Sequence, residues 1–374
     1  MTVYSTTKWQ ENKAMLRDEW LVTNGLGSYA GTTTAGINTR KYHGLLIASF
    51  NPPVDRRLLV SKLDETIIAD GQEYPLASNL VNDIDYQERK NNLEEIEETA
   101  FKRGTTAQTT ENIKYSSQGY QNLLSFNDEE LPTYTYQANN ILVTKTVFLV
   151  YDSNTTVVKY RILDSGSKTK LSLKPLLNNR NHNQSQLKEE LNYQIVANKD
   201  KQLQLKSKDT ALNIYWTAGE FELAEDYYEG MYYPFEKYRG ETDLDDHYIP
   251  GELKVDISNQ REFAVVFSTE DLAEINVEQW EEDYKERQQK LIEKAPNIEN
   301  DWLEELILAA DKFIVERYST ANKTILAGYP WFTDWGRDTM IALPGLTLAT
   351  GRYQEAKEIL TTFALNLKKG LLPN

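Results

Sequence analysis

The chain has 374 residues, of which 40% are hydrophobic and 11% aromatic, as expected for a globular protein with room for two domains. Acidic residues outnumber basic ones 57 to 41, and the net charge of −16 opposes binding to nucleic acid or to an anionic membrane. The sequence has no cysteine, no long apolar run and no basic, apolar leader, so we expect a cytoplasmic protein without disulfides. Its histidines, His43, His182 and His247, are too scattered to predict a metal site, and no cofactor is expected.

Short apolar runs recur through the first two thirds of the chain, separated by clusters of Asn, Asp, Gly and Ser. Most are rich in Val, Ile, Leu, Thr and aromatic residues, which is typical of strands joined by polar turns. No helical period of useful length lies between them, so we predict an antiparallel β-sandwich over residues 1–275 and not a βαβ fold. The charged segment Tyr86–Arg103 is expected to be a solvated excursion. The predicted strands are Ile141–Val150, Thr156–Ile162, Gln202–Leu205, Leu212–Trp216 and Phe263–Phe267.

Charged residues at helical spacing mark a change of pattern after the predicted sandwich. Val277–Ala295 pairs Glu with Lys and ends before a proline, so we predict an exposed linker helix within residues 276–298. Apolar residues then recur every three or four positions, and Asp301 with Glu304 resembles a capping box. The predicted helices of this last region, residues 299–374, are Asp301–Tyr318, Thr339–Thr350 and Tyr353–Lys368.

A glycine-rich segment, Asn24-Gly-Leu-Gly-Ser28, lies near the start of the chain. It lacks the lysine of a phosphate-binding loop and the longer spacing of a dinucleotide fingerprint, so we do not expect it to bind a nucleotide. A turn that needs positive φ angles at Gly25 and Gly27 explains both glycines.

Aromatic and charged side chains are concentrated in the segment Ala327-Gly-Tyr-Pro-Trp-Phe-Thr-Asp-Trp-Gly-Arg-Asp338. Four aromatic residues, two carboxylates and one arginine precede an apolar run that begins at Thr339. Aromatic faces cover the apolar C–H patches of a sugar ring, and an Arg/Asp pair binds its hydroxyls in a fixed geometry. The composition of this segment therefore indicates a glycan-binding subsite.

This segment also resembles a known family, the glycogen debranching enzymes or amylo-α-1,6-glucosidases. Gly328–Asp338, followed by Thr339-Met-Ile-Ala-Leu-Pro-Gly345, is similar to the opening of their glucosidase domain. A second block resembles the N-terminal domain of the bacterial and archaeal members; it consists of Glu19-Trp-Leu-Val-Thr-Asn-Gly-Leu-Gly-Ser-Tyr29 and Asn38-Thr-Arg-Lys-Tyr-His-Gly44.

Two weaker similarities to the same family lie between these blocks. One is Leu173-Lys-Pro-Leu-Leu-Asn-Asn-Arg180 with His182, and the other is Tyr233-Pro-Phe-Glu-Lys-Tyr-Arg-Gly240 running to Gly251. Together the four matches follow the family's order and span almost the whole chain.

The resemblance implies a fold and an activity. After the sandwich it implies a six-hairpin toroid, of which these residues would form only the first helices, an incomplete (α/α)6 toroid. The implied reaction is hydrolysis of α-1,6-linked glucose at branch points of glycogen or a related α-glucan. An inverting enzyme needs two carboxylates roughly 6.5 to 9.5 Å apart, and the resemblance places both beyond Asn374. We therefore expect an N-terminal fragment that binds an α-glucan and is inactive alone.

The resemblance and the residue chemistry together suggest roles in the subsite. Asp338 and Arg337 are expected to hold the hydroxyls of the non-reducing glucose, with Trp335 and Trp331 as walls. Helix capping is the alternative role for Asp338. Asp334 is either a rim contact or a turn residue.

For several other polar and aromatic residues, the sequence is compatible with either a sugar contact or a packing role. His182 and Arg180 are expected to form an interdomain hydrogen-bond pair. Trp216 and Tyr227–Tyr233 form either the sandwich core or a platform for outer glucan units. The resemblance places a further segment near the domain interface, where packing and direct sugar contact are both open for Arg40, Tyr42 and His43.

Two further functions are compatible with these residues. A carbohydrate-binding protein without activity would keep the subsite. A glucoamylase-like or trehalase-like exo-glycosidase would use the same toroid, because fold and subsite do not fix the linkage that is cleaved.

Overall fold

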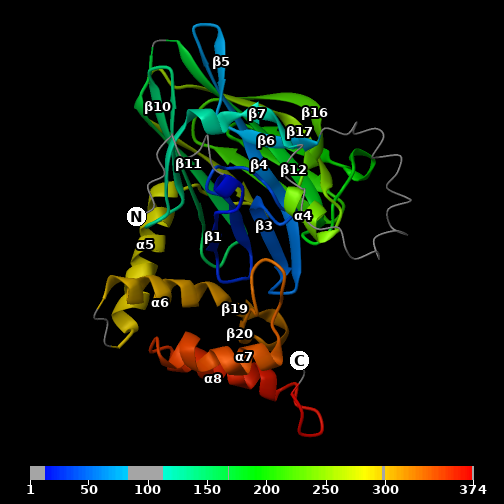
Figure 1. Cartoon of the computed structure of the whole chain (residues 1–374), viewed down its shortest axis with the longest axis vertical. Coiled ribbons are helices and arrows are strands. Elements are labelled where there is room, and N and C mark those ends of the chain that lie inside the picture. Colours follow the sequence, from blue (N-terminus) through cyan, green and yellow to red (C-terminus); the bar gives the residue numbers. More distant parts are fainter. Residues whose placement is uncertain (1–12, 83–112, 167, 297–299, 373–374) are drawn as a thin grey trace.

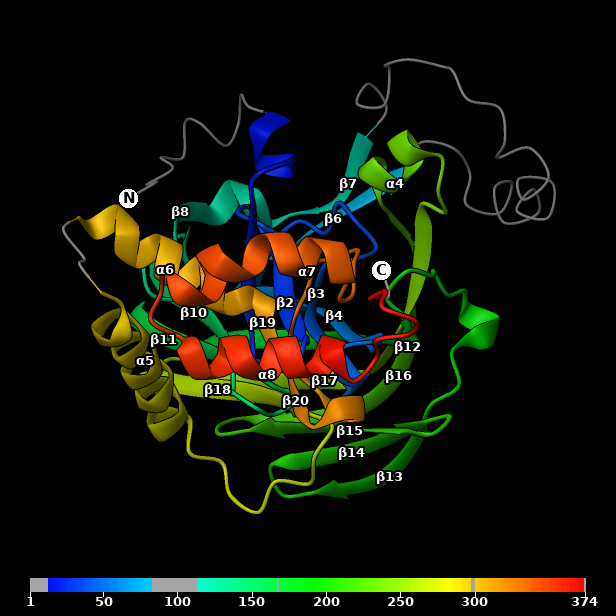
Figure 2. The same ribbon diagram turned by 90° about the horizontal axis from the view of Figure 1, so that it is seen from below.

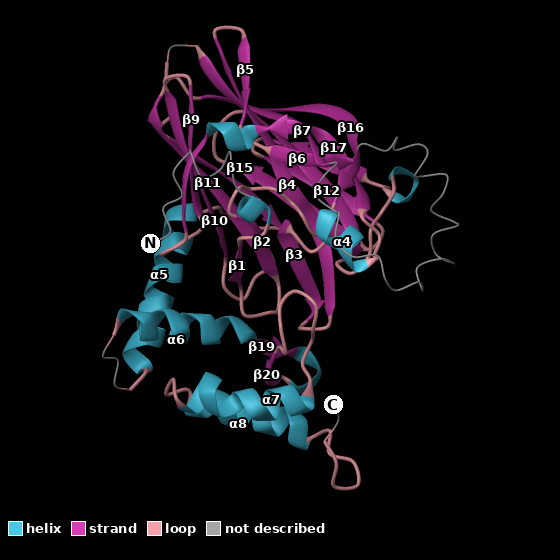
Figure 3. Ribbon diagram, in the orientation of Figure 1, coloured by secondary structure: helices cyan, strands magenta, loops and turns pink. Residues whose placement is uncertain are grey.

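Two antiparallel sheets of eight strands each make up most of this computed structural model, which describes residues 13–82, 113–166, 168–296 and 300–372. The sheets occupy the upper part of the molecule in Figure 1, and helices from the end of the chain lie beneath them. Figure 3 shows the same division by secondary structure, with strands above and most of the helical residues below. The predicted charged excursion at Tyr86–Arg103 lies outside the described residues.

The first sheet has the strand order β1-β2-β3-β4-β12-β17-β16, and β5 pairs with β4. Its longest contact joins β4 to β12, which pair antiparallel from Thr169 opposite Ala69 to Asn181 opposite Arg57. The strands of this sheet are β1 Glu19–Thr23, β2 Tyr29–Thr33, β3 Gly44–Asn51, β4 Asp55–Ala69, β5 Gln72–Pro75, β12 Thr169–Asn181, β16 Glu220–Tyr232 and β17 Leu244–Asp256.

The second sheet has the order β13-β14-β15-β18-β11-β10-β9-β8. The predicted strands are confirmed here, because β10 pairs with β11, β14 with β15, and β18 with both β11 and β15. Its strands are β8 Leu123–Asn127, β9 Thr133–Ala138, β10 Ile141–Leu149, β11 Thr155–Asp164, β13 Gln194–Lys199, β14 Gln202–Ser207, β15 Thr210–Trp216 and β18 Glu262–Ser268.

Short elements complete this part of the chain. They are a separate pair of strands and short helical turns, namely β6 Ser78–Asn82, β7 Ile113–Gln118, η1 Lys13–Leu16, η2 Gly119–Asn122, η3 Lys188–Glu190 and α4 Pro234–Arg239.

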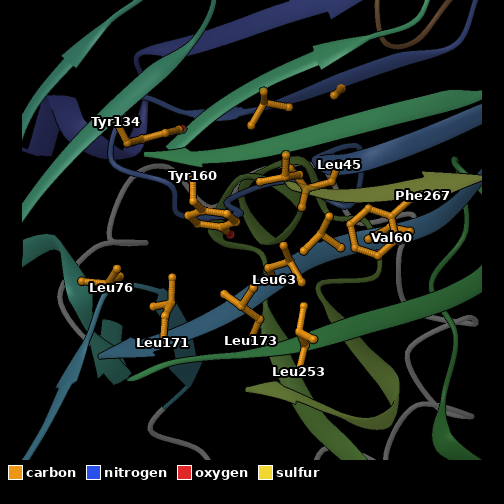
Figure 4. Packing of buried hydrophobic residues seen from close by; sticks show 14 of the residues in the cluster. Leu45, Val60, Leu63, Leu76, Tyr134, Tyr160, Leu171, Leu173, Leu253 and Phe267 are labelled. Atoms are coloured by element: carbon orange, nitrogen blue, oxygen red, sulfur yellow. The ribbon is translucent and has the colours of Figure 1, made fainter. Parts of the chain in front are cut away.

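The main hydrophobic core lies between the two sheets. Figure 4 shows Val60 and Leu173 of the first sheet together with Tyr160 and Phe267 of the second, all of which are fully buried. Side chains of a strand point alternately to its two faces. In β10, every second side chain over most of the strand is therefore buried in this core, and the others point outward. The prediction of an antiparallel β-structure for this region is therefore confirmed.

The linker helix is less exposed than predicted. It forms α5, Val277–Lys294, and begins at Asn276, whose side chain accepts a hydrogen bond from the backbone N–H of Gln279 at 3.1 Å. One face of α5 packs through Trp280 and Tyr284 against the second sheet, because these two aromatic side chains interrupt the otherwise charged pattern. The helix thus contacts the sheet that it follows.

The next helix, α6, covers Asp301–Phe313 and is shorter than predicted. Ile314 and Val315 continue the apolar period, but they are buried as part of strand β19, Ile314–Arg317, which pairs with β20, Asn322–Ile325. Their β-branched side chains favour this extended pairing. The predicted capping box is also wrong, because the N-cap is the preceding residue Asn300 and its side chain makes no cap hydrogen bond.

Of the last two predicted helices, the first differs from its predicted limits at both ends, and the second begins at Tyr353 as predicted but ends earlier. Helix α7 spans Gly336–Leu343, and a π-helical segment, η5 Pro344–Leu348, follows because a proline cannot donate to the regular ladder. Helix α8 spans Tyr353–Ala364 and stops before a tight turn closed by a bridge between Lys368 and Leu371.

These helices have a small core of their own and a partly uncovered apolar surface. Ile314, Leu343, Ile359 and Phe363 pack together where α7 and α8 lie side by side below the sandwich (Figure 2). Large apolar side chains nevertheless remain exposed on this group of helices, namely Trp302, Leu306, Ile341, Leu360 and Leu365.

Candidate functional site

The glycine-rich segment is a structural turn, as predicted. Gly25 and Gly27 have φ angles of 81° and 88°. A Cβ at Gly25 would lie 2.6 Å from the ring of Tyr151, so a side chain there would collide as well as strain the backbone. The carbonyl of Gly25 accepts a hydrogen bond from the N–H of Glu316 at 2.8 Å, which ties the turn to β19.

The aromatic segment forms a closed loop between β20 and α7. The N–H of Ala327 donates to the carbonyl of Thr333 at 2.9 Å, and the N–H of Phe332 donates to that of Gly328 at 2.9 Å. At the end of this loop the side chain of Asp334 is only 7% exposed and forms an ion pair with Arg317.

Asp334 therefore has a clear structural role. The hydroxyl of Thr324 also donates to its carboxylate, at 3.0 Å, so two elements hold this side chain. Its carboxylate is thus bound inside the protein. The exposed aromatic side chains of the loop are Trp331, Phe332 and Trp335.

The ring of Trp331 lies against two parts of the sandwich. It meets Tyr42, from the connection between β2 and β3, edge to face at 6.1 Å. The guanidinium carbons of Arg40 and Arg239 lie 5.6 Å and 5.5 Å from the centre of the same ring. Arg40 also lies over Phe235 at 4.5 Å, so α4 and the β2–β3 connection form one aromatic and cationic surface with the loop.

A network of charges fixes Arg40. Its Nε donates to Glu19 at 2.8 Å, and the Nε2 atom of His43 lies 3.5 Å from the other oxygen of the same carboxylate. Nδ1 of His43 accepts from the backbone N–H of Thr39 at 3.1 Å, which places the ring proton of a neutral imidazole on Nε2. Burial raises the pKa of Glu19, but the hydrogen bonds from His43 and Arg40, together with the charge of Arg40, outweigh it and lower that pKa to about 2.

Arg40 and Glu19 also line an open hollow of about 530 Å³ in the surface of the sandwich. This volume lies within the usual range of small-ligand sites. The remaining lining residues are Arg17, Asp18, Thr34, Phe126 and Asp128.

The predicted N-terminal residues fall into two groups. Tyr42 and His43 are both 4% exposed and lie behind the surface, where burial raises the pKa of Tyr42. Arg40 is partly exposed, and its guanidinium carbon lies 5.6 Å from the centre of the Trp331 ring. Packing thus accounts for Tyr42 and His43, whereas Arg40 has access to a ligand.

The predicted sugar-binding pair lies on the first turn of α7. Arg337 and Asp338 are both exposed, and N-cap Trp335 makes no side-chain cap hydrogen bond. Trp335 meets Phe332 edge to face at 6.1 Å and not Trp331. The structure thus brings Trp331 together with Arg40 and Tyr42, and places Trp335 with Arg337 and Asp338 farther along the same segment.

Two residues of this surface were not predicted from the sequence. Arg239 and Phe235 belong to α4, which lies within one of the weaker family similarities, Tyr233–Gly240, and that similarity was the available signal. Beneath them Glu236 is fully buried, burial raises its pKa, and its Oε2 lies 3.4 Å from Arg239.

Arg180 and His182 do form a hydrogen-bond pair, because Nη1 of Arg180 donates to the carbonyl oxygen of His182 at 3.4 Å. His182 also bridges the sandwich and the loop, since its Nε2 lies 3.2 Å from the carbonyl oxygen of Pro330. Arg180 in addition binds Asp245 inside the sandwich, because both residues belong to neighbouring strands of the first sheet. Trp216 is buried, in agreement with its core interpretation.

His182 makes the stability of the fold depend on pH. Burial, and then the charge of Arg56, lower its pKa from 6.5 to about 4. A histidine with a lowered pKa in the folded state stabilises fully above pH 6.5, and this contribution falls as the pH drops towards 4, by about 3 kcal/mol at most. We expect the free energy of unfolding, measured by urea titration, to fall less in His182→Gln than in the wild type when the pH is lowered from 6.5 to 4. Equal losses in both proteins would contradict the assignment.

No helix among the described residues is long and apolar enough to cross a membrane. Nor does the same part of the chain contain a group of three or more His, Asp or Glu residues placed to hold a metal ion.

Comparison with known families defines the class of this chain. Residues 18–264 match the family described as "Glycogen debranching enzyme N terminal", and residues 308–374 match "Amylo-alpha-1,6-glucosidase". These matches place the chain among the glycoside hydrolases. It belongs to the glycogen debranching enzyme family, as the sequence motifs predicted.

Individual relatives and solved structures match different shares of the chain. A glycogen debranching enzyme of Saccharomyces cerevisiae is 46% identical over 56 residues, which are 14% of this chain and 4% of that protein. A bacterial glucoamylase solved with acarbose has a TM-score of 0.44 at 12% identity, covering 95% of this chain and 49% of its own. The inverting GH92 mannosidase of Bacteroides thetaiotaomicron has a TM-score of 0.27 at 10% identity, covering 56% and 30%. The chain thus spans about half of the glucoamylase and a small part of the yeast enzyme.

Proposed function

We propose that this chain supplies part of the glucan site of an enzyme that hydrolyses α-1,6-linked glucose at branch points of glycogen or a related α-glucan. The supporting observation is the surface at which Trp331 meets Arg40 and Arg239. Exposed aromatic rings beside guanidinium groups suit a neutral polyhydroxylated ligand, because rings pack on C–H faces and planar donors bind hydroxyls. The family matches favour an α-glucan as that ligand.

The exposure of each side chain suggests its role in the proposed glucan site. We propose that Asp338 and Arg337 hold the hydroxyls of the terminal glucose and that Trp335 and Trp331 form its walls. Arg40 would contact the next glucose units, which the adjoining hollow of about 530 Å³ has room to accept. The buried residues act indirectly in this proposal: Tyr42 and His43 support Arg40 and Trp331, and Asp334 holds the loop.

We further propose a division into a sandwich domain over residues 1–275, a linker over 276–298 and the start of an (α/α)6 toroid over 299–374. The exposed apolar side chains of α6, α7 and α8 support this organisation, because further toroid helices would cover them. Hydrolysis needs two carboxylates. Within the described segment 331–338, Asp338 is exposed and Asp334 is paired with Arg317. We therefore propose that the catalytic acid and base belong to the further toroid helices and not to residues 299–374.

Glucan binding and glucose release should separate in this chain. We expect native electrophoresis to show retarded migration in gels that contain glycogen, and no release of glucose from a limit dextrin. A polypeptide that also contains the proposed acid and base should release glucose from the limit dextrin and not from maltose or trehalose. Migration unaffected by glycogen would refute the glucan site. Glucose release by the chain alone would refute the placement of the acid and base.

A further inference from the structure

Two neighbouring side chains of the sandwich bind the backbone on either side of Trp331. Nη2 of Arg56 donates to the carbonyl oxygen of Phe332 at 2.7 Å. Nε2 of His182 lies 3.2 Å from the carbonyl oxygen of Pro330. The residues that precede and follow Trp331 are therefore each held by a side chain that lies far away in sequence.

The first sheet fixes the distance between these two side chains. Arg56 belongs to β4, and His182 directly follows β12, which pairs with β4. The backbone N–H of His182 donates to the carbonyl oxygen of Arg56 at 3.1 Å, and Nδ1 of its ring lies 3.1 Å from the same oxygen. Because both donors sit at one point of a paired sheet, the positions of the two loop carbonyls are set together.

Burial of the charged side chain of Arg56 costs desolvation free energy, which a purely structural position would avoid with an apolar residue. Its residue surface is fully buried, and among the described residues no carboxylate forms an ion pair with it. Nε and Nη1 have no hydrogen-bond partner. The ring of Tyr329, 5.8 Å from the guanidinium carbon, and the carbonyl of Phe332 are the contacts that offset its desolvation. Both contacts are made with the aromatic loop, so Arg56 stabilises the position of this loop.

We propose that Arg56 and His182 are positioning residues that hold the Trp331 loop against the sandwich and so set the geometry of the glucan surface. Neither side chain contacts sugar in this scheme. The proposal rests on the function proposed above only for its effect on glucan binding, since the position of Trp331 can be measured without any ligand. Without these donors the loop loses two of its attachments to the first sheet, and Trp331 moves away from Arg40.

The first experiment measures the accessibility of Trp331 in the ligand-free chain. Acrylamide quenching is compared in pairs of proteins with and without Trp331→Phe, so that the difference reports this tryptophan among the seven in the chain. Arg56→Met removes the donors at similar length and should make Trp331 more accessible. The matched control is Arg57→Met, one residue along the strand and on the opposite face, where the lost ion pairs with Asp55 and Asp209 are at the surface. It should leave Trp331 unchanged.

The second experiment measures binding of a glucosyl-branched maltooligosaccharide by calorimetry. We expect roughly tenfold weaker binding for Arg56→Met, as for the loss of one hydrogen bond from a charged donor, and partial recovery for Arg56→Lys. Arg57→Met should bind as the wild type does. If Arg56→Met does not fold, His182→Leu removes the bond to Pro330 and takes its place in both experiments.

The outcomes separate this proposal from the proposed function. Unchanged Trp331 accessibility in a folded Arg56→Met or His182→Leu protein would overturn the positioning role. Increased accessibility together with no oligosaccharide binding by the wild type would support the positioning role and refute the glucan site. A change of the same size in Arg57→Met would show a general loosening of the sheet and would also overturn the proposal.

Discussion

Asp245→Asn should destabilise the protein by about 3 to 5 kcal/mol, the usual result of removing one partner of a buried ion pair. The carboxylate and Arg180 are 0% and 2% exposed, and Nη2 of the arginine lies 2.7 Å from Oδ2. Tyr233 donates to Oδ2 at 3.0 Å, and the N–H of Gln186 donates to Oδ1 at 2.8 Å. The asparagine keeps the volume but leaves the buried guanidinium without a counter-charge. Urea unfolding measures the loss.

Two comparisons make this result specific. Glu286→Gln removes the surface partner of Lys290, which is 71% exposed, and should change the free energy of unfolding by less than about 1 kcal/mol. Arg180→Met combined with Asp245→Leu removes both charges and should recover much of the loss, because no buried ion is left unpaired. If Asp245→Asn were as mild as Glu286→Gln, the buried pair would have no special energetic role.

Asp338→Asn should lower kcat/KM for glucose release by about 10- to 150-fold, or about 1.5 to 3 kcal/mol, the range for hydrogen bonds to charged groups. The exposed carboxylate is proposed to accept sugar hydroxyls, and the amide replaces one acceptor oxygen by a donor. The measurement uses a glucosyl-branched oligosaccharide and a polypeptide that contains the proposed acid and base. Folding should hardly change.

Asparagine is an informative replacement because it is also a good residue for a helix N-terminus. If Asp338 served only the start of α7, Asp338→Asn would retain kcat/KM within a few fold. Asp334→Asn is the matched comparison within the same segment. It should instead lower the melting temperature, since Asp334 is ion-paired with Arg317.

Local patterns were enough to predict most of the sheet structure. Strands such as β10 and β11 follow from short runs rich in Val, Ile, Leu and Thr that are bounded by polar turns, a signal contained within each strand and its flanks. Strand β19 was missed because Ile314 and Val315 also fit the apolar period of the preceding helix. Only the pairing with β20 determines which structure they adopt, and that pairing is tertiary information.

The site was predicted less completely, for a related reason. Trp331, Asp338 and Arg337 could be chosen because aromatic and charged residues are concentrated in one segment. Arg56 gave no signal, since an arginine in a strand is usually exposed and its partner Phe332 lies 276 positions away. The ion pair of Arg180 with Asp245 was missed for the same reason, because strand order and not sequence spacing brings these two residues together.

The long separation between the loop and its anchors also bears on synthesis. The carbonyl of Phe332 is bound 276 residues after Arg56, and that of Pro330 is bound 148 residues after His182. During translation the strands that carry both anchors emerge first, and N-terminal parts generally fold before later ones. Contacts of this separation form late because they close long segments of chain. We therefore expect the nascent sandwich to fold before the aromatic loop leaves the ribosome, so that the surface around Trp331 is completed only when the loop docks on it.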